Sequence, residues 1–339
     1  MLQPTTWSRD GLIKRLVDYI DIASISGDEE AFLKRLEDDF RACGYRTERQ
    51  MVVDGRYNLL ALPVAGPAKI LFSTHVDVVP PHIPARVTED AIWGRGACDT
   101  KGGLVAMMAA ADRLDPSREF IGFLLVIAEE VDHIGAIVAQ ELDLKPLAII
   151  LCEPTTGHLV SGQKGLLKLR LNSSGEAAHS AFPELGQDAL APLLDSLDRL
   201  RKTDYPTDPV LGDTTLNIGT LKAGVAANIT PPEATAELLY RVTSDPETLL
   251  EQVRLLCSDD VTIETISETP PIALNTVEGF PLENIAFNTD AIHLASLGPV
   301  YLMGPGDIRV AHGENEHIPV SALETGVDDY VRLVQTLMS

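Results

Sequence analysis

The chain has 339 residues, of which 45% are hydrophobic and 23% charged, and its formal net charge is −23. This length exceeds the usual size of one hydrophobic core, so we expect two domains. The strong negative charge argues against nucleic acid and anionic membranes as partners. No apolar run is long enough to span a membrane, no signal-peptide pattern begins the chain, and four widely spaced cysteines are typical of reduced thiols. We therefore expect a cytoplasmic protein.

The first half of the chain alternates helical and strand-like segments and returns to this pattern near its end. Apolar spacing predicts helices over residues 10–23, 28–43, 102–114, 289–297 and 322–338. Short apolar runs predict strands buried on both faces at residues 69–76, 121–128, 147–152 and 299–303. Alternation of this kind predicts an α/β domain with a mainly parallel sheet.

The middle of the chain has a different pattern. Apolar and polar residues alternate over 166–171, 215–220 and 234–242, which predicts half-exposed antiparallel strands. Helical stretches over 188–200 and 246–257 lie among them. We expect residues 163–269 to form an inserted α+β domain, with 1–162 and 270–339 building the discontinuous first domain.

Polar side chains stand where the predicted parallel strands end. His75 ends the first strand, Glu130 follows the second, and Glu153 follows the third. Ligands of open parallel sheets bind beyond these carboxyl ends, so the three residues should meet in one crevice, with Asp99 beside them. A single carboxylate there is usually solvated or caps a helix. Together, however, they concentrate negative charge that only a cation offsets, and mixed His and carboxylate ligands suit zinc.

Five motifs in the same order resemble those of a metallopeptidase family that includes acetylornithine deacetylase, succinyl-diaminopimelate desuccinylase, aminoacylase and glutamate carboxypeptidase. They are residues 73–80 (STHVDVVP), 94–103 (GRGACDTKGG), 128–131 (AEEV), 304–307 (GPGD) and 311–316 (AHGENE). The resemblance implies a mainly parallel-sheet zinc-hydrolase catalytic domain of α/β class. It also implies that the inserted α+β domain serves as a lid and joins two subunits into a homodimer.

The same resemblance implies two Zn²⁺ ions about 3.5–4 Å apart, with Co²⁺ or Mn²⁺ as alternatives. Asp99 bridges them in this interpretation. Glu130 and His312 complete one site, and His75 and Glu153 complete the other. A water between the ions is the expected nucleophile.

The family pattern also assigns catalytic roles. Glu129 is the expected general base, and Asp77 is expected to hydrogen-bond the second ring nitrogen of His75 and fix its tautomer. His179, in the insert, is expected to polarise the scissile carbonyl, often across a dimer; its alternative role is to cap a loop. The other histidines match no motif and are interpreted as surface or packing residues: His82, His133, His158, His293 and His317.

Candidate substrate-binding residues follow from the same comparison. Asn228 precedes a Pro-containing turn, and Arg241 ends a predicted strand where the family places an Arg that meets a substrate carboxylate. A structural salt bridge is the alternative for Arg241. Gly304 and Gly306 are expected to offer backbone N–H groups to the substrate, unless they form an ordinary turn.

The ending of the chain looks closest to acetylornithine deacetylase and acetyl-lysine deacetylase. We therefore expect removal of an N-acyl group from a small N-acyl amino acid, N-acetyl-L-ornithine first, in arginine or lysine biosynthesis. Glu314 and Glu316 are candidates for holding its cationic tail. The alternatives are a succinyl-diaminopimelate desuccinylase, a metallo-dipeptidase or carboxypeptidase, and a catalytically silent metal-binding homologue. A Ser or Cys hydrolase using Cys98 or Cys152 is a further class.

Overall fold

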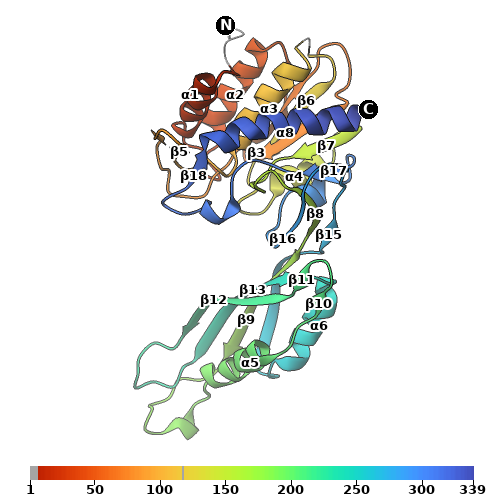
Figure 1. The fold of residues 1–339 in the computed structure, drawn as a ribbon. Helices are drawn as coiled ribbons and strands as arrows, with labels where there is room; N and C mark the ends of the chain where they lie inside the picture. The colour runs from red at the N-terminus through yellow and green to blue at the C-terminus, as the bar shows by residue number, and fades with distance from the viewer. Residues whose placement is uncertain (1–6, 117) are drawn as a thin grey trace. The chain divides into compact units, whose positions relative to one another are not determined.

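The computed structural model describes residues 7–116 and 118–339, which divide into two units (Figure 1). Unit 1 contains the described residues up to Ser161, Leu274–Glu283 and Thr289–Ser339. Unit 2 contains Gly162–Ala273 and Asn284–Asn288. The segment 284–288, which the sequence pattern assigned to the first domain, thus lies in unit 2. None of the described helices is long and apolar enough to cross a membrane.

The four apolar runs form neighbouring parallel strands of one sheet in unit 1, as predicted. They are β3 (Ile70–His75), β6 (Ile121–Val126), β7 (Ala148–Leu151) and β17 (Val300–Leu302). The full sheet has the order β1-β2-β6-β3-β7-β17. Phe72 of β3 lies in register with Phe123 of β6 and Ile150 of β7, and every residue of β3, β6 and β7 is buried. Burial on both faces explains why these strands show no polar alternation.

Two antiparallel strands that the sequence interpretation missed extend this sheet. They are β1 (Arg46–Val53) and β2 (Arg56–Leu62), and β2 pairs antiparallel with β6. Asp54 and Gly55 join them with φ angles of 49° and 79°. An Asp-Gly pair with both φ positive is the turn that favours a two-residue hairpin.

Helices cover the sheet and place its aromatic core. They are α1 (Arg9–Ile20), α2 (Glu30–Ala42), α3 (Lys101–Leu114), α4 (Ile134–Ala139), α7 (Ala291–Leu294) and α8 (Val320–Met338). Phe40 of α2 packs on Phe123 at 4.7 Å between ring centroids, and Tyr330 of α8 packs on Phe72 at 5.5 Å. Such pairs contribute about 0.5–1.5 kcal/mol each beyond their buried area. The predicted helix over 289–297 is confined to α7, which begins after Thr289 accepts a hydrogen bond from the N–H of Ala291.

Short strands complete the main-chain pairing. One sheet has the order β18-β5-β4, and its strands are β4 (Arg86–Val87), β5 (Ala91–Trp93) and β18 (His317–Pro319). Another has the order β15-β8-β16, with β8 (Leu159–Gln163), β15 (Ile272–Ala273) and β16 (Leu282–Ile285) at the places in sequence where the units divide. Single 3₁₀ turns lie at Pro183–Leu185 and Ile308–Val310.

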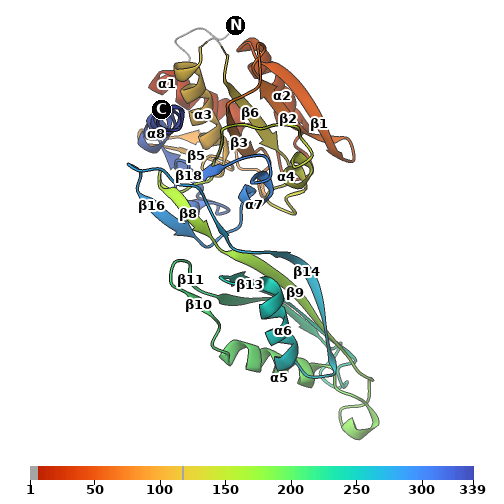
Figure 2. The same ribbon diagram turned by 90° about the vertical axis from the view of Figure 1, so that its right-hand side faces the viewer.

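Unit 2 is a four-stranded antiparallel sheet with two helices on one face. The order is β12-β13-β9-β14, so β9 runs between β13 and β14 (Figure 2). The strands are β9 (Gly165–Ser174), β12 (Thr215–Ala223), β13 (Glu233–Val242) and β14 (Val261–Thr269), with a small hairpin of β10 (Thr207–Asp208) and β11 (Gly212–Asp213). Leu167, Leu169 and Leu171 alternate inward and pack beneath α5 (Leu190–Lys202) and α6 (Pro246–Leu256). One covered face explains the alternating sequence pattern.

Candidate metal centre and catalytic site

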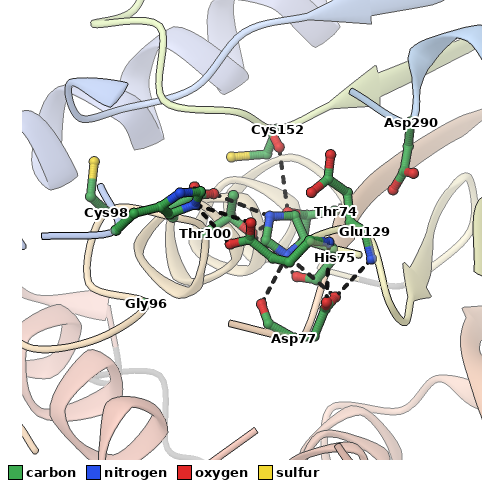
Figure 3. Close-up of polar contacts among 12 residues, drawn as sticks. Thr74, His75, Asp77, Gly96, Cys98, Thr100, Glu129, Cys152 and Asp290 are labelled. Atoms are coloured by element: carbon green, nitrogen blue, oxygen red, sulfur yellow. Dashed lines mark hydrogen bonds and ion pairs between the residues drawn. The ribbon is translucent and has the colours of Figure 1, made fainter. Parts of the chain in front are cut away.

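The carboxyl ends of three parallel strands bring the candidate ligands of unit 1 together. His75, labelled in Figure 3, is the last residue of β3. Glu130 follows β6, and Glu153 follows β7. The chain turns sharply after β6, because Ala128 has a φ of 59° and its carbonyl accepts hydrogen bonds from the N–H groups of Asp132 and His133. This turn lets the consecutive residues Glu129 and Glu130 both face the site instead of pointing to opposite faces of a strand.

Two groups of candidate donors share Asp99. His75, Asp99 and Glu153 form one group, and Asp99, Glu130 and His312 form the other, each with donor atoms within 4.8 Å of one another. Asp99 Oδ1 lies 3.1 Å from His75 Nε2, and its Oδ2 lies 3.4 Å from His312 Nε2. One carboxylate oxygen therefore faces each histidine, which is the arrangement that a carboxylate bridging two cations requires.

The electrostatics of these groups are those of a site built for cations. Glu153 is 4% exposed, and its Oε1 has no hydrogen-bond partner among the described residues. Burial, together with the charges of Glu129 and Asp99, raises the pKa of Glu153 well above its usual value. An unpaired buried carboxylate costs several kcal/mol unless a positive ion faces it. The donor set of two imidazoles and three carboxylates fits zinc or a similar divalent ion.

A buried ion pair holds the two loops that carry Asp99 and His312. Glu316 Oε1 accepts hydrogen bonds from the N–H groups of Gly96, Cys98 and Asp99 at 2.8, 3.2 and 3.2 Å. Its Oε2 accepts from Arg95 Nη1 at 2.5 Å, and Arg95 Nη2 donates to the main-chain carbonyl of His312 at 3.3 Å. The pair therefore fixes the main chain of both ligand loops. Glu316 is 1% exposed, so the expectation that it holds a cationic substrate tail is wrong.

Asp77 contacts the second ring nitrogen of His75 through its main-chain carbonyl as well as its carboxylate. His75 Nδ1 lies 2.9 Å from the main-chain carbonyl oxygen of Asp77, whereas the Asp77 carboxylate is 3.6 Å away. That carboxylate also accepts a hydrogen bond from the N–H of Glu129 at 3.1 Å (Figure 3). It accepts two more, from the N–H of Glu130 at 3.2 Å and from Ser26 Oγ at 2.7 Å. Asp77 therefore orients both the histidine, through its carbonyl, and the Glu129–Glu130 turn, through its side chain.

Glu129 lies beside the two donor groups and has a perturbed pKa. Burial raises the pKa of its carboxyl to about 8, and the nearby charges of Asp290 and Glu130 act in the same direction. His133 Nδ1 lies 3.6 Å from Glu129 Oε1 and 2.9 Å from Asp290 Oδ1. A carboxyl beside a metal centre is suited to take up and release a proton. His133, interpreted from sequence as a surface or packing residue, thus contacts the candidate base.

The thiols near the site are unsuited to nucleophilic catalysis. Cys98 and Cys152 are each 1% exposed. Burial raises the pKa of Cys152 to about 12 and raises that of Cys98 further. Because the thiolate is the reactive form, these environments disfavour the cysteine-hydrolase alternative.

The remaining predicted site residues divide between the units. His179, Asn228 and Arg241 all lie in unit 2. His179 Nδ1 accepts a hydrogen bond from the N–H of Ala181 at 3.1 Å, which is the loop-capping contact considered as its alternative. The main-chain carbonyl of Asn228 accepts a hydrogen bond from the N–H of Ser180 at 3.0 Å, so the loops that carry Asn228 and His179 lie side by side. Arg241 is on β13, opposite Thr215 and Leu166.

Gly304 and Gly306 follow β17 in unit 1 and lie close to the ligand loops. The N–H of Gly304 donates to Thr155 Oγ1 at 3.0 Å, so within this structure it serves the protein's own turn. A Cβ at Gly304 would meet the carbonyl oxygen of Glu153 at 2.5 Å, and one at Gly306 would meet Cys98 Sγ at 2.6 Å. Close approach of the main chain to the ligand loops therefore requires glycine at both positions.

Sequence reasoning gave no role to Arg95 and Asp290 and assigned other roles to His133 and Glu316, all of which support the site. His133 follows Glu129 at an i, i+4 spacing, which is a usable but weak signal. Asp290 is 157 positions from His133, and Arg95 is 221 positions from Glu316, so only folding brings these pairs together.

Comparison with known proteins gives a consistent result. The model of the family described as Peptidase family M20/M25/M40 matches residues 71–336, a range that contains all five candidate ligands. A probable carboxypeptidase of Aspergillus flavus is 36% identical over 371 residues, covering 95% of this chain and 86% of that protein. A Peptidase M20 domain-containing protein of Schizosaccharomyces pombe is 34% identical over 337 residues, covering 96% and 84%.

A solved structure has the same fold. The crystal structure of a tripeptidase from Staphylococcus aureus superposes with a TM-score of 0.82 at 21% identity, covering 97% of this chain and 98% of that one. The α/β architecture with a central, mostly parallel sheet is therefore confirmed. The particular closeness to acetylornithine deacetylase expected from the sequence is not supported, because the relatives are named as carboxypeptidases.

Proposed function

This chain belongs to the peptidase family M20/M25/M40, and from that premise we propose that it is a metallopeptidase that removes the C-terminal residue of short peptides. One observation carries the proposal. Two groups of candidate donors share Asp99, and the carboxyl of Glu129 lies beside them. This is the constellation that hydrolysis of an unactivated amide needs: cation ligands next to a general base.

We propose that His75, Asp99 and Glu153 hold one ion and that Asp99, Glu130 and His312 hold the other. The donor chemistry and the unpartnered Glu153 Oε1 support Zn²⁺, with Co²⁺ or Mn²⁺ as substitutes. Ions bound there supply Lewis acidity and lower the pKa of a water molecule. The proposal predicts that chelators remove activity and that added zinc or cobalt restores it.

The protein's own groups move the proton. Glu129 accepts a proton from the attacking water and passes it to the leaving amine nitrogen, so that one carboxyl serves as base and then as acid. Asp77 holds the main-chain N–H groups of Glu129 and Glu130 and thereby fixes the direction from which the base acts. The catalytically silent alternative gives no reason for a further carboxyl beside the metal groups.

Substrate recognition is proposed to depend on a free carboxylate. The naming of the relatives supports the carboxypeptidase or dipeptidase alternative over deacetylation of N-acetyl-L-ornithine. Arg241 is our candidate for binding the terminal carboxylate, since a guanidinium pairs with it in a bidentate way. His179 is proposed to polarise the scissile carbonyl, and Asn228, Gly304 and Gly306 to line the peptide. A homodimer through unit 2 remains part of this proposal.

The test compares substrates that differ at one end. Purified zinc-loaded protein receives an N-blocked dipeptide, its C-terminal amide, the unblocked dipeptide, N-acetyl-L-ornithine and N-succinyl-diaminopimelate. We expect kcat/KM to be about 10²-fold higher for the blocked dipeptide than for its amide, the worth of one or two charge-assisted hydrogen bonds. Equal cleavage of acid and amide would contradict the carboxylate requirement. Preference for N-acetyl-L-ornithine would restore the deacetylase alternative, and preference for unblocked dipeptide would indicate a dipeptidase.

The base is tested separately. Glu129→Gln keeps the size and the hydrogen-bonding oxygen of the side chain but cannot carry a proton at neutral pH. We expect kcat to fall by about 10²–10⁴-fold while zinc content, measured by atomic absorption, stays at the wild-type level. Undiminished kcat would remove Glu129 from the base role.

A further inference from the structure

A third cluster of metal-binding side chains lies in unit 1 beside the two groups described above. Glu129, His133 and Asp290 offer one imidazole nitrogen and two carboxylate oxygens, all within 4.8 Å of one another. His133 Nδ1 faces both carboxylates, at 2.9 Å from Asp290 Oδ1 and 3.6 Å from Glu129 Oε1. Figure 3 shows Glu129 and Asp290 as neighbours at the edge of the site. Imidazole nitrogen and carboxylate oxygen are both ligands that zinc accepts in proteins.

The buried state of Asp290 points independently to a missing cation partner. Asp290 is 1% exposed, and only one of its carboxylate oxygens is engaged by His133. The other, Oδ2, is buried and has no hydrogen-bond partner among the described residues. Buried carboxylate oxygens in folded proteins are normally satisfied, so an orphaned one at a His and Glu cluster indicates a ligand.

Main-chain hydrogen bonds and backbone conformation hold the donors of this cluster in place. His133 precedes α4 with a φ of 58°, a left-handed conformation that directs its ring back toward Glu129. Asp290 precedes α7, and its main-chain carbonyl accepts the N–H groups of His293 and Leu294, which fixes its position. The three donors therefore come from two separate segments that are each held by their own main-chain hydrogen bonds.

We propose that Glu129, His133 and Asp290 form a third divalent-cation site that fills when zinc is in excess and inhibits the enzyme. The entering ion displaces the proton of His133 Nδ1 and binds the carboxylate oxygens of Glu129 and Asp290. His133 Nδ1 must give up any proton it carries before it can bind the ion. The inhibitory consequence rests on the proposed base role of Glu129, because an ion on its carboxylate occupies the lone pair that accepts the proton of water.

The first measurement counts ions without turnover. Chelator-treated protein is dialysed against increasing free Zn²⁺, and bound zinc is measured by atomic absorption. We expect a final stoichiometry of three for the wild type and of two for His133→Asn and for Asp290→Asn. Asparagine tolerates the positive φ at position 133, which keeps this variant foldable if Asp290→Asn is not. His293→Asn is the matched control, because the ring of His293 lies 5.7 Å from that of His133 but belongs to no donor group. This variant should bind three zinc ions.

The second measurement follows activity against free zinc with the best substrate of the panel. For wild type and His293→Asn, kcat should rise to a maximum with increasing free zinc and then fall by at least 10-fold. For His133→Asn, kcat should rise to a plateau and stay there. A wild-type stoichiometry of two would overturn the inference. So would inhibition by excess zinc that persists unchanged in His133→Asn. If the peptidase proposal fails for want of a substrate, the ion count still decides whether the third site exists.

Discussion

Loss of the Glu316 carboxylate should weaken both the fold and the metal centre. In Glu316→Ala the guanidinium of Arg95, which is 2% exposed, keeps its charge but loses its ionic partner. Removing one member of a buried pair costs about 3–5 kcal/mol, which is a large share of the about 5–15 kcal/mol that stabilises a typical domain. The N–H groups of Gly96, Cys98 and Asp99 lose their acceptor at the same time.

The metal centre should respond because the same carboxylate positions Asp99 and, through Arg95, the main chain of His312. Loss of groups that orient metal ligands lowers affinity by about 10–100-fold. We expect the zinc dissociation constant, measured by competition with a chromophoric chelator at low temperature, to rise by that factor. Urea unfolding of the metal-free protein gives the change in stability.

Asp39→Ala is the control, because Asp39 neutralises another buried arginine of unit 1, Arg15, at 2.7 Å. This substitution should lower the free energy of unfolding by several kcal/mol, because it removes one member of a buried pair. It should leave zinc affinity within about threefold of wild type. The proposed role of Glu316 at the metal centre is refuted if Glu316→Ala binds zinc as tightly as wild type. It is refuted equally if Asp39→Ala loses the same affinity, since the effect would then follow from destabilisation alone.

Three further outcomes follow from the structure. Burial lowers the pKa of Lys101 to about 7 against about 10.4 in the unfolded chain, so the unfolded state binds more protons between these values. The unfolding free energy of the metal-free protein, measured by urea unfolding, should therefore rise by about 1.4 kcal/mol per pH unit more in wild type than in Lys101→Met between pH 7 and 9. An equal dependence on pH in the two proteins would contradict this. Gly103→Ala should lower the free energy of unfolding by about 1–3 kcal/mol, because its Cβ would meet Cys152 Sγ at 2.0 Å. Adding Cys152→Ala should recover part of that loss in a double-mutant cycle. Chelation should lower the melting temperature measured by calorimetry, because zinc at 1,000 times its dissociation constant adds about 4.1 kcal/mol, and an unchanged melting temperature would mean that no resident ion stabilises the fold.

The sequence by itself determined the sheet and the candidate ligand set. The strands β3, β6 and β7 are short apolar runs, because a strand that is buried on both faces needs apolar side chains on both. Because parallel strands end at one edge, His75, Glu130 and Glu153 could be placed together from chain position alone. The hairpin of β1 and β2 was missed because β1 is largely exposed and its side chains carry little apolar periodicity.

Only the tertiary structure decided which side chains support those ligands. His133 meets Asp290, and Arg95 meets Glu316, across sequence separations of 157 and 221 residues. No periodic pattern encodes contacts between residues so far apart in sequence, because side-chain periodicity reports the exposure of a segment and not the partner that it meets. The same is true of the Asp77 carboxylate, which accepts hydrogen bonds from the N–H groups of the Glu129–Glu130 turn. Local sequence thus set the ends of the strands, and the packing of distant loops set the chemistry around them.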